Sequence, residues 1–253
     1  MDLGLSGKKA LVTGSTRGIG RAIVNLLADE GVDLAICSRN QEQVDEAVAD
    51  LSAKGVKVTG AVVDVADKDS YQAWIKSAGE ELGGIDIFVP NVSAGGGSVD
   101  EQGWTNNFNI DLLGTTRGIE AAMPFLEKSD AASIVVIGSI AAVEEFAAPQ
   151  TYNAIKGAVI IHAQQLALAL GGQGIRVNCV SPGPVFVEGG DWDFIKNNMP
   201  DFYNATLAKI PRGALGTPEE VANAVAFLAS PAASLVTGVN LVADGGHTKR
   251  VQL

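Results

Sequence analysis

The stretch KALVTGSTRGIGRA, residues 9–22, joins a short apolar run to a cluster of glycines at positions 14, 18 and 20. The G-x-x-x-G-x-G spacing differs from G-x-G-x-x-G and from a phosphate loop that ends in Gly-Lys-Ser/Thr. Glycines permit a tight strand-to-helix turn and a close approach of backbone amides, and the N-terminus of the following helix favours a pyrophosphate. Such a cluster can also be only a tight turn. Its place directly after a strand that opens a βαβ unit favours nucleotide binding.

The rest of the chain alternates short apolar runs with longer segments of helical periodicity. Seven strands are predicted at residues 9–13, 33–37, 57–63, 85–89, 133–137, 175–180 and 238–242. Helices are predicted at residues 18–30, 40–54, 67–82, 104–127, 150–171 and 217–229. Fully apolar strands that alternate with helices indicate an α/β fold with a mostly parallel sheet covered on both faces. We therefore expect a doubly wound, seven-stranded Rossmann-type domain.

Composition bounds the class of protein. The 253 residues are 47% hydrophobic and only 19% charged, which is enough to bury a large core. No linker, repeat or composition shift divides the chain, so we expect one domain over residues 1–253. The formal net charge of -11 argues against a nucleic-acid partner, because binding to the phosphate backbone relies on a basic surface. A small-molecule substrate remains as the expected partner.

Targeting signals and metal sites are not expected. The N-terminus lacks the hydrophobic region of a signal peptide, and no run of about 18 apolar residues could span a bilayer. Cys37 and Cys179 lie in apolar runs, which favours buried, reduced thiols over a disulfide. With only His162 and His247, no zinc site can be assembled. The sequence thus predicts a soluble cytoplasmic protein without a metal or a membrane partner.

A long segment without strand character, residues 184–216, is predicted to be an insertion over the carboxyl edge of the sheet. Open α/β sheets bind their ligands at this edge. The segment carries aromatic residues at Phe186, Trp192, Phe194, Phe202 and Tyr203. They are either the wall of a pocket for a partly apolar carbonyl or alcohol, or a cluster that packs only within the insertion.

Proton-transfer chemistry is indicated by Ser139, Tyr152 and Lys156. Ser139 stands at the end of a predicted strand, and Tyr152 and Lys156 lie one turn apart on one face of the next helix. A neighbouring ammonium stabilises a phenolate, so the three residues can exchange a proton with an oxygen held by the serine hydroxyl. A tyrosine and a lysine at this spacing also occur by chance. The serine beside a predicted nucleotide site makes chance a poorer explanation.

These motifs together resemble the short-chain dehydrogenase/reductase family. The resemblance rests on residues 13–20 (TGSTRGIG), Asp64-Val65, Asn91, Ser139, the run YNAIK at 152–156, Ser181-Pro182-Gly183 and Asp244-Gly245-Gly246, in this order along the whole chain. The sequence is similar to the 3-oxoacyl-carrier-protein reductase and tropinone reductase branches. The resemblance implies a ketone/alcohol oxidoreductase of class EC 1.1.1.- in which the nicotinamide exchanges a hydride with the substrate carbon. It also implies a homotetramer or homodimer in which residues 104–127 and 150–171 pair between subunits.

The resemblance assigns the site residues position by position. Tyr152 is the implied general acid or base, Lys156 supports its phenolate and binds the nicotinamide ribose, and Ser139 holds the substrate oxygen. The implied cofactor-binding residues are Gly14, Ser15, Thr16, Arg17, Gly18, Ile19, Gly20, Ser38, Arg39, Asp64, Val65, Asn91, Tyr152, Lys156, Pro182, Gly183 and Val185. Asp64 and Val65 are expected at the adenine, Asn91 at the adenosine ribose, and residues 182–185 at the carboxamide.

Three positions depart from the family pattern. Asn91 is followed by Val92 and Ser93 rather than by small residues, and Val187 replaces a threonine. Asp111 stands where the family has a fourth catalytic residue, an asparagine, which supports a water that links the lysine to solvent. An ionised aspartate accepts hydrogen bonds but cannot donate them. We expect it either to act through its main-chain carbonyl or to change the pH dependence of the Tyr152–Lys156 pair.

The cofactor is predicted from charge at the end of the second strand. Members that use NAD place an acid there, which binds the ribose diol and repels a 2′-phosphate. This chain has Ser38 and Arg39 instead, with Arg17 in the glycine segment. A guanidinium suits a phosphate, so NADP(H) is favoured over NAD(H), although Arg39 could instead stack on adenine or lie in solvent.

The sequence leaves three functions open. The favoured reading is an NADP(H)-dependent ketone/alcohol oxidoreductase. The alternatives are an NAD-linked alcohol or polyol dehydrogenase, and a regulator that binds cofactor without turnover. Glu144, Glu188 and Asp191 disfavour an acidic or acyl-carrier substrate, so a small neutral ketone or a polyol ranks first.

Overall fold

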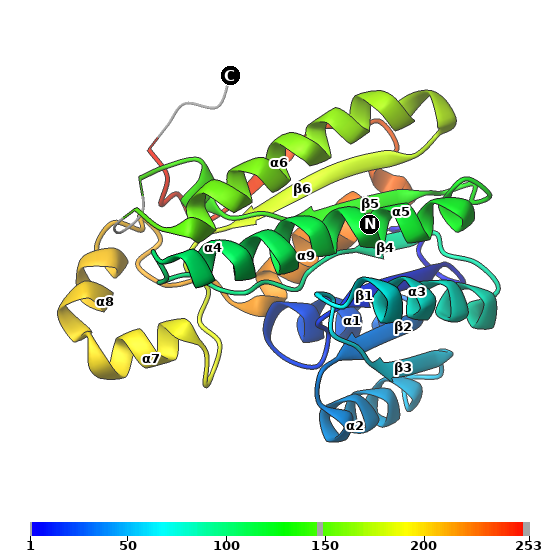
Figure 1. Cartoon of the computed structure of the whole chain (residues 1–253), viewed down its shortest axis with the longest axis horizontal. Coiled ribbons are helices and arrows are strands. Elements are labelled where there is room, and N and C mark those ends of the chain that lie inside the picture. Colours follow the sequence, from blue (N-terminus) through cyan, green and yellow to red (C-terminus); the bar gives the residue numbers. More distant parts are fainter. Residues whose placement is uncertain (1, 146–148, 250–253) are drawn as a thin grey trace.

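The computed structural model describes residues 2–145 and 149–249 and shows one seven-stranded sheet (Figure 1). The strands are β1 (Lys9–Thr13), β2 (Asp33–Ser38), β3 (Val58–Val62), β4 (Ile87–Val89), β5 (Ser133–Ile137), β6 (Arg176–Pro182) and β7 (Asn240–Ala243). Their order across the sheet is β3-β2-β1-β4-β5-β6-β7. Each neighbouring pair is parallel. The order reverses between β1 and β4, which creates a crevice at the carboxyl edge beside the glycine segment.

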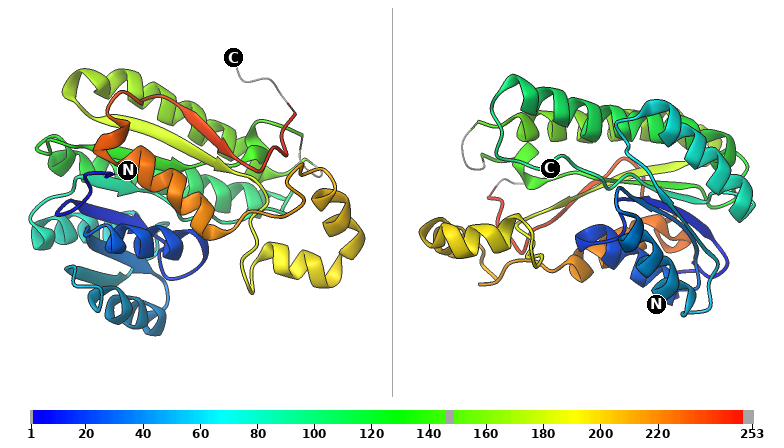
Figure 2. Two further views of the ribbon diagram at one scale, coloured as in Figure 1. Left: turned by 180° about the vertical axis from the view of Figure 1, so that it is seen from behind. Right: turned by 60° about the horizontal axis from the view of Figure 1, so that its bottom comes forward.

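The helices lie on both faces of the sheet. They are α1 (Gly18–Asp29), α2 (Gln41–Ser52), α3 (Lys68–Leu82), α4 (Glu101–Asn107), α5 (Gly114–Leu126), α6 (Thr151–Leu170), α7 (Asp191–Asn198), α8 (Pro200–Leu207) and α9 (Pro218–Ala229). A π-helix, η1 (Phe108–Leu113), joins α4 to α5, and short 3-10 turns are η2 (Ile140–Ala142), η3 (Gly171–Gln173) and η4 (Pro231–Ala233). Figure 2 shows α4, α5 and α6 on one side of the sheet and α1 and α9 on the other.

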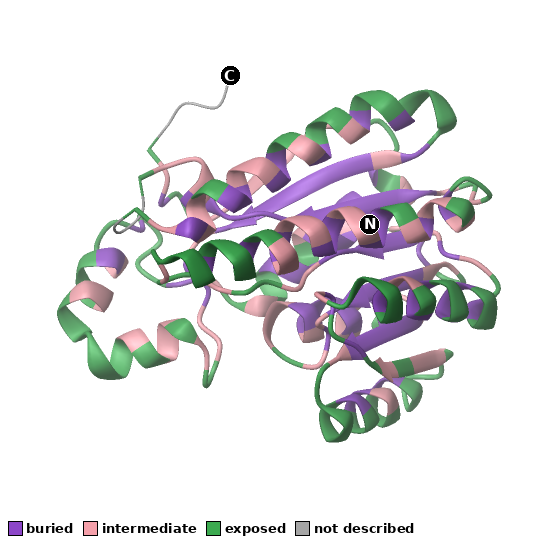
Figure 3. Cartoon of the chain, in the orientation of Figure 1, coloured by how far each residue is buried: buried purple, intermediate pink, exposed green. Residues whose placement is uncertain are grey.

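Alternation along the strands explains why both faces are covered. In β1, Leu11 belongs to the apolar cluster under α3, α5 and α6, while Ala10 and Val12 belong to the cluster under α1, α2 and α9. Successive side chains of a strand point to opposite faces, so a fully apolar strand needs a helical layer on each side. Figure 3 shows the central strands in the buried colour, whereas the edge strands β3 and β7 are half-buried or partly exposed. The prediction of a doubly wound parallel sheet is confirmed.

Two segments differ from the prediction. The single helix predicted at 104–127 is three consecutive pieces, α4, η1 and α5, and the π-helix in the middle turns Asp111 into the interior. The insertion at 184–216 contains α7 and α8, which the absence of strand character did not reveal. These two helices project from the body of the molecule and are mainly exposed or half-buried (Figures 1 and 3).

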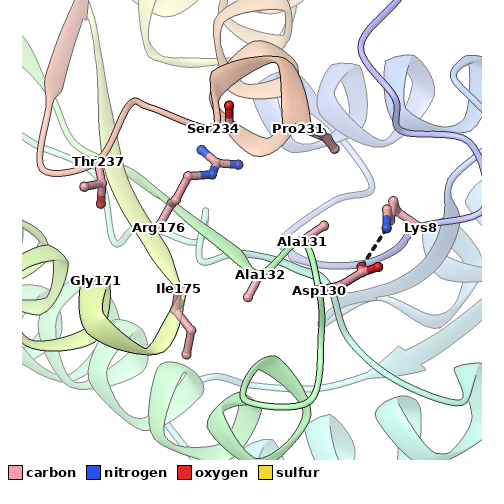
Figure 4. Close-up of a pocket in the computed structure, with 11 residues that line it drawn as sticks. Lys8, Asp130, Ala131, Ala132, Gly171, Ile175, Arg176, Pro231, Ser234 and Thr237 are labelled. Atoms are coloured by element: carbon pink, nitrogen blue, oxygen red, sulfur yellow. Dashed lines mark hydrogen bonds and ion pairs between the residues drawn. The ribbon is translucent and has the colours of Figure 1, made fainter.

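A pocket of about 470 Å³ lies at the amino edge of the sheet, opposite the crevice (Figure 4). Its lining includes Lys8, Asp130 and Arg176, which precede or begin β1, β5 and β6. Arg176 donates to the carbonyls of residues 228–230, where α9 ends, and Lys8 pairs with Asp130 at 2.9 Å. The cationic groups are thus already engaged by the protein. This pocket is remote from the residues predicted to carry the chemistry.

One described segment, Thr151–Gln173, is long and apolar enough to cross a membrane by those measures alone. It comprises α6 and η3, and its inner face packs on the sheet through Val159, Ile160 and Ala163. We therefore interpret it as a core helix.

Candidate active site

The glycine segment forms a close-packed turn between β1 and α1. Gly14 has φ +62°, and a Cβ added at Gly20 would lie 2.2 Å from the Gly14 carbonyl oxygen and 2.6 Å from the Asn91 amide nitrogen. Only glycine fits at Gly20 without moving the backbone. Ser15 is buried and donates to the Val12 carbonyl at 2.9 Å, so its hydroxyl braces the turn.

The N-terminus of α1 is left without a side-chain cap. Asn40 caps α2 and Asp67 caps α3, whereas the Arg17 side chain does not cap α1, and its first turn carries no acid. The first amides of a helix have no partner within the helix, and together with the helix dipole they attract an anion. This arrangement fits a pyrophosphate. The Val187 methyl groups would lie 3.5 Å from a Cβ at Gly18, so the insertion begins beside the same turn.

Asn91 and Val92 tie the end of β4 to the glycine segment. The Asn91 amide donates to the Thr13 carbonyl at 3.0 Å and to the Gly14 carbonyl at 3.1 Å. Both amide hydrogens are thus used within the protein, and the contact of Asn91 with a ribose stays a prediction. A Cβ at Gly14 would meet the Val92 side chain at 2.8 Å, which shows how tightly the departure at 92 packs here.

The end of β2 carries positive charge and no acid. Arg17 and Arg39 are both exposed, and the Ser15 amide donates to the Cys37 carbonyl at 3.2 Å, which joins the two segments that bear them. The Ser38 hydroxyl accepts a hydrogen bond from the Asn40 amide at 3.1 Å, so its own hydrogen can still donate. At the end of β3, Val65 is buried, and the Asp64 carboxylate accepts from the Ala66 amide at 2.9 Å.

Ser139 lies two residues beyond β5 and caps the turn η2. Its Oγ accepts a hydrogen bond from the Ala141 amide at 3.2 Å, and the side chain is nearly buried. Because the oxygen is the acceptor in this bond, the hydroxyl hydrogen can point to a substrate oxygen.

Lys156 connects the end of β5 to Tyr152. Its buried ammonium donates to the Ile137 carbonyl at 2.9 Å and lies 5.7 Å from the centre of the Tyr152 ring. Burial by itself lowers the pKa of Lys156, but attraction to Tyr152 and Asp111 outweighs it, and the pKa lies above the usual value. The lysine is therefore a fixed positive charge beneath a half-buried phenol. The arrangement can donate a proton to an oxygen and stabilise the phenolate that remains.

Asp111 uses its carboxylate, rather than only its main chain, at this site. Its Oδ1 lies 3.2 Å from the Lys156 ammonium, and both side chains are buried. The Asp111 carbonyl accepts from the Thr115 hydroxyl at 2.7 Å. The ion pair fits the alternative in which the charge of Asp111 acts on the Tyr152–Lys156 pair, and a role of its main-chain carbonyl stays a prediction.

The predicted carboxamide segment is held from both sides. The Gly183 amide donates to the Ala243 carbonyl at 3.0 Å, and Val185 forms a parallel bridge with Gly216. A Cβ at Gly183 would lie 2.6 Å from that of Asp244, so the chain passes close to the end of β7. This contact fixes residues 182–185 at the carboxyl edge of the sheet.

Two residues near the site were not predicted. Asn107 and Thr151 are buried and hydrogen-bonded to each other, and Asn107 also donates to Asp111. The one available signal was the i, i+4 spacing of Asn107 and Asp111 in an expected helix. Among residues 2–145 and 149–249, no group of three or more His, Cys, Asp or Glu is placed to hold a metal ion.

Known proteins resemble this chain over nearly its whole length. The model of a family described as enoyl-(acyl carrier protein) reductase matches residues 14–248. Isoepoxydon dehydrogenase patN of Penicillium expansum is 40% identical over 250 residues, which are 97% of this chain and 96% of that protein. Dehydrogenase/reductase SDR family member 4 of Oryctolagus cuniculus is 37% identical over 98% of this chain and 96% of its own length.

A solved structure shares the fold. L-sorbose reductase of Gluconobacter frateurii, complexed with NADPH and L-sorbose, superimposes with a TM-score of 0.90 at 30% identity. The match covers 99% of this chain and 100% of that one.

Proposed function

Because the chain belongs to the short-chain dehydrogenase/reductase family of oxidoreductases, we propose that it interconverts a ketone and a secondary alcohol with NADP(H). The observation that carries the proposal is the buried Lys156 ammonium. It contacts the end of β5 two residues before Ser139 and lies under the Tyr152 ring on the next helix. A hydrogen-bond donor, a proton donor and a fixed cation thus converge at the carboxyl edge of the sheet.

Each residue of the proposed site has one role in the reduction of the carbonyl group. Bound NADPH would supply the hydride to the carbonyl carbon. Ser139 donates a hydrogen bond to the carbonyl oxygen, and Tyr152 gives its proton to the same oxygen as negative charge develops there. Lys156 stabilises the phenolate that is left. In the oxidation direction the phenolate of Tyr152 accepts the proton of the alcohol.

Support for NADP(H) comes from the surroundings of the glycine segment. The uncapped N-terminus of α1 fits the pyrophosphate, and the glycines leave room for it. Arg17, Arg39 and Ser38 supply donors for a 2′-phosphate, and residues 38–41, where β2 ends, contain no acid to repel it. The complex of L-sorbose reductase with NADPH supports the same preference.

For the substrate, we propose a small neutral ketone or its alcohol, of sugar or polyol type. L-sorbose reductase, which is complexed with NADPH and L-sorbose, acts by its name on a sugar, and isoepoxydon dehydrogenase is by its name also an oxidoreductase. The net charge of -11 disfavours an acidic carrier protein as the partner.

A substrate panel run with both cofactors and in both directions tests the proposal. NADPH absorbance is followed with ketones that include L-sorbose and small cyclic ketones, and with the corresponding alcohols. Tyr152→Phe should lower kcat by about 10²-fold or more, the range of general acid–base catalysis, while NADPH fluorescence on binding is retained. Tyr203→Phe is the control, because it removes a phenol in α8. A protein that binds NADPH but turns over nothing would be a regulator, and faster turnover with NADH would indicate the NAD-linked alternative.

A further inference from the structure

A buried polar network joins the π-helix η1, the loop after β4 and the first turn of α6. The Asn107 amide nitrogen donates to the Gly95 carbonyl and to Asp111 Oδ2, each at 3.1 Å. The Asn107 oxygen accepts from the Thr151 hydroxyl. The Ala94 amide also donates to Asp111 Oδ2, at 3.0 Å. Three segments that are separate in sequence thus meet at one amide side chain.

Every polar atom of the Asn107 side chain is hydrogen-bonded. Both amide hydrogens and the carbonyl oxygen have partners within the protein, and the residue is 2% exposed. Asp111 is equally buried, with two donors on Oδ2 and the Lys156 ammonium on Oδ1. A buried ion pair is tolerable only when its remaining lone pairs are satisfied. Asn107 supplies one of the two hydrogen bonds that the Asp111 carboxylate accepts, both at Oδ2, while Oδ1 has the Lys156 ammonium at 3.2 Å.

We propose that Asn107 is a positioning residue for proton transfer: it holds the Asp111 carboxylate against Lys156 and, through Thr151, fixes the helical turn that carries Tyr152. The inference deepens the proposed function and rests on it for its kinetic consequence. Asn107 itself touches neither reactant.

The consequence is electrostatic. The Lys156 ammonium faces Tyr152 on its own helix, Asp111 on η1 and Cys179 on β6. Burial raises the pKa of the Cys179 thiol to about 11, so near neutral pH the thiol adds no charge. Asp111 therefore competes with the Tyr152 phenolate for one cation. The network holds the carboxylate beside the ammonium and so sets how strongly it competes.

A tyrosinate titration at 295 nm measures this without substrate. Each variant is compared with the same variant carrying Tyr152→Phe, so that the difference reports Tyr152 and cancels Tyr71 and Tyr203. Asp111→Asn removes the competing charge and should move the midpoint to lower pH by about 1 unit. Asn107→Ala should move it in the same direction by a smaller amount, because the carboxylate loses a donor and can turn from Lys156. In the Asp111→Asn background, Asn107→Ala should produce no further shift.

Matched variants separate positioning from general damage. Asn106→Ala removes an exposed asparagine of the same helix and should leave the midpoint unchanged. Thr151→Val should shift the midpoint as Asn107→Ala does, and Thr151→Ser, which keeps the hydroxyl, should restore it. If Asn107→Ala does not fold, the Thr151 pair decides the question.

The pH profile of alcohol oxidation should follow the same midpoints. An Asn107→Ala midpoint equal to that of Asn106→Ala, or an equal shift in both Asp111 backgrounds, overturns the inference. Full turnover in Tyr152→Phe would instead overturn the proposed function, so the two failures are distinguishable.

Discussion

Arg39 is the residue to which we assign the proposed preference for NADP(H). It is exposed at the end of β2, on a segment hydrogen-bonded to the glycine turn that bears Arg17. Arg39→Asp replaces a guanidinium, which donates hydrogen bonds, with a carboxylate that accepts them from a ribose diol and repels a 2′-phosphate. A hydrogen bond to a charged group contributes about 1.5–3 kcal/mol, so the ratio of kcat/KM for NADPH over NADH should fall about 10- to 100-fold.

The control for this prediction is Arg21→Gln. Arg21 lies in α1 near the same crevice, but its guanidinium is bound to Asp50 at 2.6 Å and to Asn25 at 3.1 Å. Arg21→Gln also makes the net charge more negative, but it removes a guanidinium that is already bound within the protein. The ratio of kcat/KM for NADPH over NADH should therefore stay within about twofold of wild type. Equal ratios for Arg39→Asp and wild type would refute the assignment of NADP(H).

At the scale of residues, sequence patterns nominated Ser139, Tyr152 and Lys156 as residues that would act on a ligand, and they did not indicate Asn107 and Thr151, which pack behind them. Ser139, Tyr152 and Lys156 are recognisable because their spacing is local and their chemistry is distinctive. Asn107 and Thr151 become partners only when α4 docks on α6. The sequence indicated that Asp111 could act on the Tyr152–Lys156 pair, but not the direct contact with Lys156, because that contact depends on where the π-helix places the side chain.

At the scale of elements, periodicity predicted the strands and main helices to within a few residues. It failed where helical periodicity changes without a change in composition. Residues 104–127 read as one amphipathic helix, but six of them form a π-helix, a geometry frequent at functional sites. Helices α7 and α8 were missed because they bury little, and a helix without an inner face leaves no clear apolar stripe.

Helices α7 and α8 are held together by their own aromatic residues. Trp192 stacks on Phe202, with ring centres 6.2 Å apart, and meets Tyr203 edge-on at 6.3 Å. The alternative in which these aromatics pack within the insertion therefore holds for these three residues. Their effect on a substrate would be indirect, through the shape and order of the helix pair.

Trp192→Ala tests this role of the helix pair. Two aromatic contacts of about 0.5–1.5 kcal/mol each are lost, so the pair loosens and KM for the ketone should rise about tenfold. The NADPH dissociation constant should change less than about twofold, because the glycine turn is untouched. Phe194→Ala, on the same helix but 62% exposed, should leave KM near wild type. An unchanged KM in Trp192→Ala would show that the insertion does not order the substrate site.

At the scale of the whole molecule, one sheet separates two apolar clusters, and the predicted site residues follow the carboxyl ends of its strands. Alternation within the strands made this architecture predictable, because fully apolar strands need helices on both faces. The surface for assembly could not be predicted in the same way. Exposed apolar residues on α4, η1 and α6 were not distinguishable in sequence from residues that face the sheet.

We propose that α4, η1 and α6 pair with the same helices of a second copy. Trp104, Phe108, Ile161 and Leu168 are between 45% and 87% exposed. Ile161 and Leu168 lie two turns apart on one face of α6, and Trp104 and Phe108 lie one turn apart. A two-fold pairing would bury both patches at once, as isologous interfaces do.

Leu168→Glu combined with Ile161→Glu should dissociate the assembly by placing four carboxylates in the interface of each pair of chains. Light scattering after size exclusion should then give a monomer of 26.0 kDa, against a multiple of that mass for wild type. Ala49→Glu, an exposed change on α2, is the control for added charge and should assemble as wild type does. Because each copy carries a net charge of -11, low ionic strength should weaken assembly and salt should strengthen it. A wild-type chain that is monomeric at all salt concentrations, or a double variant that assembles normally, would contradict this pairing.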